Sequence, residues 1–322
     1  MNNALLYFLT VLIWGSTWIA INYQLGDVAL EASVTYRFAL ATVVLFAYCL
    51  IRKLPLAMSA RQHFRLALFG MALFGFNYFM LYQAQQHINS ALTCIAFSTL
   101  TLFNIINARI WYKTAISKQV LIGGVLGFIG IVTLFWPQVN ELSLSDATLY
   151  GLILCLIGTL SASAGNMISI RNQRSSMPVI QSNAWGMGYG AIFMAIVTVI
   201  QGKAFTFDNS FSYVSSLLYL SIFGSVIAFS CYLSLMTRIG SHKTSYANIM
   251  FPAVAVIIST FVEDFEWNIF AIAGLTIIIL GNLVILAKPR KERVKTMVLE
   301  DANAESEEIP NRQLSPRKVL AN

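Results

Sequence analysis

Aromatic and amide side chains recur inside long apolar stretches of this sequence, where polar groups are costly to bury. In residues 65–86, Tyr78 and Tyr82 are four residues apart and so lie on one face of a helix, with Asn77 beside them. Polar groups in a membrane helix normally face protein or a water-filled cavity, so these side chains could hold an apolar or aromatic ligand. An aromatic belt at the membrane surface is the alternative for Tyr82, but it explains the deeper Asn77 and Tyr78 less well.

Other apolar stretches carry similar groups, and each has a packing alternative. Trp14 offers a ring on which a ligand could stack, whereas Ser16 also suits close packing of helices. Trp185 and Tyr189 are again four residues apart, and they lie among glycines. The remaining candidates for the lining of a binding cavity are Ser98, Asn166, Tyr246 and Asn248.

Arg37 is the only basic residue well within an apolar stretch. Its side chain could extend to the membrane surface or pair with an acid such as Glu31 or Glu263. Alternatively, its guanidinium could bind the carboxylate of a ligand. Pro252 also has two possible roles, since it removes a backbone hydrogen bond and disturbs the carbonyl of Asn248. That carbonyl could bind a ligand, or the proline could only bend the helix.

Groups that would support catalysis are missing from the sequence. A membrane enzyme needs His, Asp, Glu or Cys side chains clustered near one membrane face, and here they are scattered. We therefore expect no enzyme, no cofactor and no metal site. The phosphate-binding pattern GxxxxGK followed by Ser or Thr is also absent, which argues against ATP-driven work by this chain alone.

The composition indicates which elements must position these side chains. The chain has 322 residues, of which 57% are hydrophobic and only 11% are charged, whereas a soluble domain is about one quarter charged. A membrane core needs about 20 apolar residues per helix, so the apolar stretches predict an all-α polytopic membrane protein with ten transmembrane helices. The predicted helices lie near residues 4–25, 32–51, 65–86, 89–112, 118–136, 147–170, 179–200, 212–236, 243–263 and 267–287.

The positive charges predict the orientation of these helices. Nineteen of the 21 Lys and Arg residues lie on one side of the ladder of predicted helices, and the positive-inside rule makes that side cytoplasmic. Both termini are therefore expected in the cytoplasm. The net charge of +7 is then explained by topology and by contact with anionic lipid, and not by nucleic-acid binding. Residues 289–322 are polar and charged, and they predict a disordered cytoplasmic tail.

The second half of the sequence partly repeats the first half at an offset of 151 residues. Seven identities keep this offset, including Gly123 with Gly274 and Gly130 with Gly281. Because five helices are an odd number, the second copy is expected to be inverted in the membrane relative to the first. The predicted five-helix repeats occupy residues 1–138 and 139–288.

Short motifs along the chain resemble those of the EamA branch of the drug/metabolite transporter superfamily. They comprise residues 13–18 (IWGSTW), Arg37-Phe38, and residues 251–254 (FPAV) followed by Glu263. Residues 258–263 with Trp267 look most like bacterial exporters of the YddG type. The resemblance extends to Lys288 and implies a ten-helix transporter with a central cavity, commonly for amino acids or other metabolites. One departure is Thr101, which stands where the second repeat has Pro252, so a hinge at Pro252 is not mirrored.

The expected function is a secondary transporter that exports small metabolites, above all aromatic or apolar amino acids, by alternating access around a central cavity. No carboxylate lies near the middle of a predicted helix, which favours uniport or weak coupling over a dedicated proton relay. Glu263 is the best carboxylate candidate if coupling exists. A membrane scaffold or sensor without transport is the alternative, and a polytopic membrane enzyme is a further one.

The expected partners are a small-molecule substrate and the lipid bilayer of the cell inner (plasma) membrane. We expect no nucleic-acid partner. The GxxxG pattern at Gly123 and Gly127 suits either helix packing within the chain or a dimer face. A monomer or a weak homodimer is therefore expected.

Overall fold

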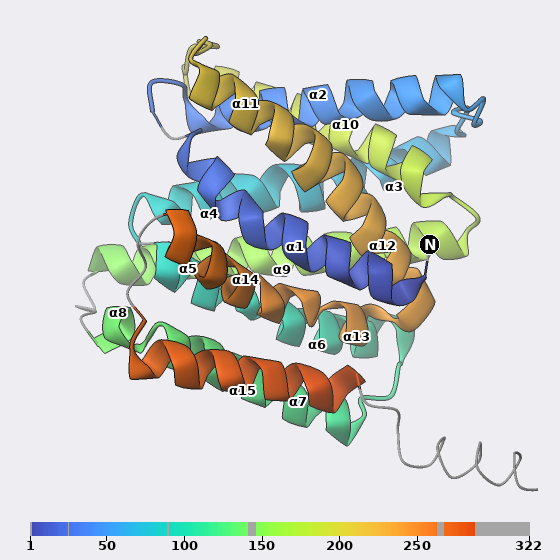
Figure 1. Cartoon of the computed structure of the whole chain (residues 1–322). Helices are drawn as coiled ribbons and strands as arrows, with labels where there is room; N and C mark the ends of the chain where they lie inside the picture. The colour runs from blue at the N-terminus through green and yellow to red at the C-terminus, as the bar shows by residue number, and fades with distance from the viewer. Residues whose placement is uncertain (1, 25, 89, 141–145, 263–266, 287–322) are drawn as a thin grey trace, which may run out of the picture.

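The computed structural model is helical, with no strand among the residues that it describes, which are 2–24, 26–88, 90–140, 146–262 and 267–286. Figure 1 shows the helices packed side by side as a bundle. The predicted disordered tail and Glu263 lie outside the described residues. The elements of the first half are α1 (Asn3–Asn22), α2 (Leu30–Ile51), α3 (Ala60–Gly70), η1 (Met71–Phe76), α4 (Asn77–Gln85), α5 (Ser90–Ser98), α6 (Leu100–Tyr112), α7 (Lys118–Leu134) and α8 (Trp136–Asn140).

The second half has a similar order of elements, and η1 and η2 are π-helical segments within longer helical runs. Each predicted apolar stretch is mostly helical over its described residues. Five helical runs are long and apolar enough to cross a membrane, namely α2, residues 60–85, α9, α10 and residues 211–239. The elements of the second half are α9 (Asp146–Arg174), α10 (Val179–Ile200), α11 (Phe211–Tyr219), η2 (Leu220–Ile227), α12 (Ala228–Ile239), α13 (Ser241–Thr244), α14 (Ala247–Val262) and α15 (Ile269–Leu286).

Two predicted helices are interrupted in the structure. The predicted helix 89–112 divides into α5 and α6, and the predicted helix 243–263 divides into α13 and α14. At the first break, the hydroxyl of Thr99 donates to the carbonyl of Ala96 at 2.6 Å. At the second, the hydroxyl of Ser245 donates to the carbonyl of Ser241 at 2.6 Å. Such hydroxyl bonds to the preceding turn compete with the helical ladder, so they bend or interrupt helices.

The helix starts follow the 151-residue offset that the sequence shows. Ser59 caps α3 and Ser210 caps α11, and each side chain accepts a hydrogen bond from the backbone N–H three residues later. Ser117 caps α7 in the same way, and the side chain of Asn268 accepts from Ala271 at the start of α15. Ser and Asn are favoured caps because their oxygens satisfy an unpaired N–H of the first turn. The two halves therefore start corresponding helices at corresponding residues.

Corresponding helices of the two halves pack against each other in antiparallel fashion. In the pair of α7 with α15, Gly123 faces Gly281 and Gly130 faces Gly274, so the residue numbers run in opposite directions. In the pair of α2 with α10, Phe46 contacts Trp185 with ring centroids 4.9 Å apart and Thr42 faces Gly188, so the numbers again run in opposite directions. Figure 1 shows the two pairs on opposite sides of the bundle. Helices α1, α4, α9, α12 and α14 lie between them.

Glycines make the close approach of α7 and α15 possible. The nearest neighbours of Gly123 and Gly130 on α15 include backbone carbonyls, and Gly127 of the GxxxG pattern faces Ile249 of α14. Small residues allow helix backbones to approach closely in a membrane. Both glycines of the GxxxG pattern thus pack within the chain, in agreement with the first of the two interpretations of this pattern.

Candidate functional site

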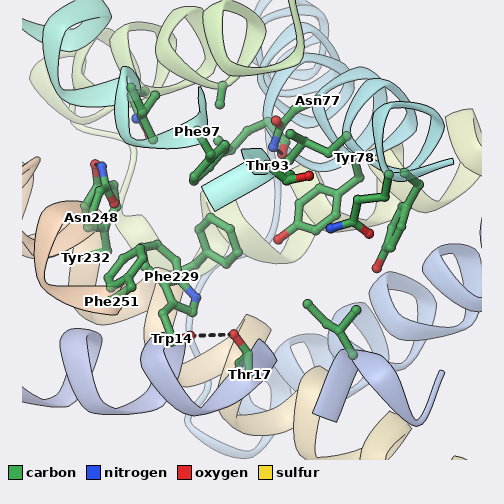
Figure 2. A pocket seen from close by; sticks show the side chains of 18 of the residues that line it. Trp14, Thr17, Asn77, Tyr78, Thr93, Phe97, Phe229, Tyr232, Asn248 and Phe251 are labelled. Carbon is green, nitrogen blue, oxygen red and sulfur yellow. Dashed lines mark hydrogen bonds between the residues drawn. The ribbon is translucent and has the colours of Figure 1, made fainter. Parts of the chain in front are cut away.

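A cavity of about 110 Å³ lies in the middle of the bundle. Helices of both halves line it, including α1 and α2 from the first half and α9, α12 and α14 from the second. Figure 2 shows the side chains that converge on it. The cavity is therefore shared by segments that are far apart in the sequence.

Aromatic rings form one wall of the cavity, and Trp14 is at their centre. Its ring centroid is 4.7 Å from that of Phe229, 4.9 Å from that of Tyr232 and 5.2 Å from that of Phe251. The indole N–H donates to the backbone carbonyl of Gly224 at 2.9 Å. Gly224 lies within η2, and π-helical segments often occur at functional sites. This hydrogen bond fixes the indole, so its ring can serve as a stacking surface.

Arg37 brings the only described cationic side chain to the lining of this cavity. It is 3% exposed, and its Nε donates to the hydroxyl of Ser225 at 2.9 Å. The guanidinium carbon lies 5.3 Å from the ring centroid of Tyr78. Its Nη1 has no hydrogen-bond partner. A buried cation with an unused donor can bind an anion, because burial without a counter-charge is expensive.

The predicted pairing of Arg37 with Glu31 is wrong. Among the described residues no acidic side chain pairs with Arg37, and the carboxylate of Glu31 instead accepts from the amide of Gln83 at 3.2 Å. Extension to the membrane surface is wrong as well, because Arg37 is buried. Pairing with Glu263 concerns a residue outside the described part of the chain. Arg37 instead belongs to the lining of the cavity.

Three asparagines, Asn77, Asn166 and Asn248, belong to the lining of the same cavity. The Nδ2 of Asn77 donates to the carbonyl of Leu73 at 3.3 Å, and the Nδ2 of Asn248 lies 3.4 Å from the hydroxyl of Tyr232. The Nδ2 of Asn166 also has a protein partner. All three side chains are buried, and none of their Oδ1 atoms has a hydrogen-bond partner. An unpaired buried acceptor costs about 1–3 kcal/mol, so a ligand that donates to it gains affinity.

Seven of the fourteen candidate residues line this cavity, six do not, and Glu263 lies outside the described residues. Those that line it are Trp14, Arg37, Asn77, Tyr78, Tyr82, Asn166 and Asn248. The others are absent from its lining in the described structure, and most of them are engaged elsewhere. They are Ser16, Ser98, Trp185, Tyr189, Tyr246 and Pro252.

The residues off the cavity satisfy their polar groups within the bundle. The hydroxyl of Ser16 contacts the hydroxyl of Tyr219 at 2.5 Å, and that of Ser98 donates to the carbonyl of Ile95 at 2.6 Å. Trp185 donates to the carbonyl of Leu56 at 3.1 Å. These side chains lie off the cavity because protein groups near them in the fold accept or share their hydrogen bonds. Likewise, Tyr189 bonds to His63, Tyr246 donates to the carbonyl of Val120, and Pro252 is buried inside α14.

Several apolar residues of the lining were not predicted from the sequence. Phe229 and Tyr232 are three residues apart on α12 and share a face, but that spacing is common in any apolar helix. Phe97 and Phe251 also line the cavity. Polarity within an apolar stretch was the signal available from sequence, and phenylalanine does not carry it.

The described residues contain no group of three or more His, Cys, Asp or Glu side chains that could hold a metal ion. What the cavity offers is a guanidinium, aromatic rings and amide oxygens. Such groups can bind an organic ligand reversibly, by charge, stacking and hydrogen bonds. The fold thus defines a multi-pass membrane protein with a cavity at its centre.

Comparison with known proteins supports the same class. The model of the EamA-like transporter family matches residues 1–136 and 149–287, so the chain belongs to this family. The chain is 29% identical over 311 residues to the uncharacterized inner membrane transporter YedA of Escherichia coli, covering 92% of this chain and 96% of YedA. It is 23% identical over 246 residues to the uncharacterized transporter YoaV of Bacillus subtilis, covering 76% of this chain and 83% of YoaV. One crystal structure shares the fold with a TM-score of 0.77 at 14% identity, over 88% of this chain and 96% of the other.

Proposed function

We propose that this protein is a secondary transporter that exports small metabolites, most of all aromatic or apolar amino acids, by alternating access. The observation that carries the proposal is the buried guanidinium of Arg37, whose Nη1 has no hydrogen-bond partner, in a cavity walled by aromatic rings. A substrate carboxylate would bind Arg37, and the apolar body would lie against Trp14 and Phe229. Asn77, which lies beside Tyr78 in Figure 2, supplies an acceptor for a substrate ammonium group.

We further propose that ten transmembrane helices form two inverted five-helix repeats, in residues 1–138 and 139–288, with both termini in the cytoplasm. The antiparallel packing of α2 with α10 and of α7 with α15 supports inversion, since an axis in the membrane plane relates such pairs. The helix caps 151 residues apart support the repeat. The positive charges on one side support the orientation. Exchanging the conformations of inverted halves opens the central cavity to the other side of the membrane.

The cell inner membrane is the proposed location, in keeping with the name of the similar YedA protein. The partners are then a small-molecule substrate and lipid. A role as an enzyme receives no support from the family or from the side chains of the cavity.

Flux into proteoliposomes tests the proposed function. The purified protein should transport labelled tryptophan, tyrosine, phenylalanine or leucine down a concentration gradient. The rate should be the same with and without a pH gradient, because none of the described residues that line the cavity carries a carboxylate. Empty liposomes are the control. Absence of flux across a broad panel of amino acids and other metabolites would contradict the proposal, and flux that requires a pH gradient would contradict its uncoupled form.

A second prediction concerns Gly224, which separates Arg37 from Thr17. A Cβ at this position would lie 3.1 Å from the Cγ2 of Thr17 and 3.3 Å from Nη2 of Arg37. Gly224→Ala should therefore displace the guanidinium by a few tenths of an ångström and lower the transport rate by about two- to tenfold. The measurement is the initial rate of substrate uptake at equal protein levels.

Gly188→Ala is the matched control for this substitution. A Cβ on Gly188 would lie 3.2 Å from the Cγ2 of Thr42, at similar tightness, but Gly188 does not line the cavity. An equal loss of transport in the two variants would show that general tightness of packing, and not displacement of Arg37, is responsible.

A further inference from the structure

The amide of Asn166 is oriented by a chain of hydrogen bonds that begins at a backbone carbonyl. The hydroxyl of Ser245 donates to the carbonyl of Ser241 at 2.6 Å, so its oxygen is free to accept. It accepts from the Nδ2 of Asn104 at 2.7 Å, which turns the Oδ1 of Asn104 toward Asn166. The Nδ2 of Asn166 then donates to that oxygen at 3.3 Å.

In this arrangement each group donates to the one before it, and the backbone carbonyl at the start only accepts. The Oδ1 of Asn166 lies at the other end of this hydrogen-bond chain, and it has no hydrogen-bond partner. Asn166 is 1% exposed and lines the cavity. Asn166 thus combines a place in the cavity wall with a buried acceptor that no protein group satisfies.

Asn166 belongs to the end of the cavity that lies away from Arg37. The side chains of Asn166 and Asn248 both interact with the hydroxyl of Tyr232. In Figure 2, Tyr232 and Asn248 lie on one side and Tyr78 on the other, with Phe229 between them. Arg37 contacts the ring of Tyr78. The cavity therefore has a guanidinium at one end, amide oxygens at the other and aromatic rings between.

We infer that Asn166, together with Asn248, determines substrate specificity by accepting a hydrogen bond from a donor at the far end of the substrate's apolar body. The inference rests on the proposed function, in which the carboxylate binds Arg37. The substrates that fit are those whose body ends in a polar N–H or O–H group, such as an indole, a phenol or a terminal ammonium. A body that ends in a methyl or phenyl group leaves the oxygens of Asn166 and Asn248 unpaired.

The cost of an unpaired acceptor sets the size of the effect. An unsatisfied buried acceptor corresponds to a preference of about tenfold for the substrate that donates to it. The preference should appear within pairs of substrates that differ only in the terminal donor. Tyrosine with phenylalanine is one such pair, and lysine with norleucine is a second.

The experiment measures competition by each member of these pairs against a labelled substrate in proteoliposomes that contain the full chain. The wild type should favour the donor-ended member of each pair by about tenfold. Asn166→Leu replaces the amide by an apolar group of similar size, and it should abolish this preference while phenylalanine and norleucine are still transported. The matched control is Asn172→Leu on the same helix, because Asn172 is also buried with an unpartnered amide but lies off the cavity. It should leave the preference unchanged.

Three results would overturn the inference. An equal loss of transport for both members of each pair in Asn166→Leu would assign Asn166 a structural role, and the proposed function would stand because the wild type still transports. Flux that requires Na⁺ in the wild type and loses this requirement in Asn166→Leu would assign the amide oxygens to a free cation. If the wild type shows no preference for the donor-ended member of either pair, the proposed hydrogen bond from the substrate to Asn166 and Asn248 does not form. Failure of the proposed function itself is different, since the wild type would then transport no member of any pair.

Discussion

Replacement of Arg37 by leucine should lower transport of carboxylate-containing substrates by about 10- to 100-fold and leave the protein at least as stable as the wild type. A hydrogen bond to a charged group contributes about 1.5–3 kcal/mol, which sets the expected loss. The stability prediction follows from the burial of the guanidinium, whose Nη1 has no partner. Removing an unpaired buried charge relieves a desolvation cost. Arg37→Lys should restore transport only in part, because an ammonium is a point charge and does not reproduce the planar guanidinium.

The measurements are uptake in proteoliposomes and the melting temperature in detergent. Arg174→Ala is the matched control, since Arg174 also lies over an aromatic ring, that of Tyr112 at 4.3 Å, but it does not line the cavity. It should change transport by less than about twofold. If Arg37→Leu transports normally, the substrate carboxylate does not bind Arg37 during transport. If Arg37→Leu unfolds, Arg37 is needed for the stability of the fold.

Gly274→Ala should destabilise the protein by about 1–3 kcal/mol or more, the cost of overpacking a tight interface. A Cβ on Gly274 would lie 2.6 Å from the Cα of Leu134 and 2.7 Å from the carbonyl oxygen of Gly130. Both atoms belong to the backbone of α7, so they cannot move aside as the end of a flexible side chain can. The α7 and α15 helices would have to separate along their contact. Small residues are needed there because close backbone approach drives helix association in the membrane.

The melting temperature in detergent and the yield of protein in the membrane measure this effect. Gly26→Ala is the control, since no atom lies within 4 Å of a Cβ built at that position. It should leave both quantities unchanged. If Gly274→Ala melted at the wild-type temperature, the close contact between α7 and α15 could not be an essential part of the fold.

Much of the helical framework follows from the sequence. The predicted helix 179–200 coincides with α10, and the predicted helices 118–136 and 212–236 differ from the observed runs by only a few residues. Length and continuous apolarity are local properties, so they can be recognised without knowledge of packing. The breaks near Thr99 and Ser245 were not predicted, because a serine or threonine hydroxyl interrupts a helix only when it bonds to the preceding turn.

The lining of the cavity is only partly predictable. Trp14, Asn77 and Asn166 are polar or amphipathic groups in apolar stretches, and this property singled them out. Tyr246 has the same property, but it lies off the cavity because its hydroxyl reaches the carbonyl of Val120. Polarity in a membrane helix indicates that a partner exists, but it does not tell whether that partner is the backbone or a ligand.

The sequence by itself determined that this protein is a multi-pass helical membrane protein with partly repeated halves, because hydropathy and residue spacing are local or periodic properties. It also located Arg37 as a buried charge that needs an explanation. Only the tertiary structure decided that Glu31 bonds to Gln83 while Arg37 lines a cavity, and that Asn166 lies in the same lining with its oxygen unpartnered. The physical reason is that satisfaction of a buried polar group depends on atoms that distant segments bring together.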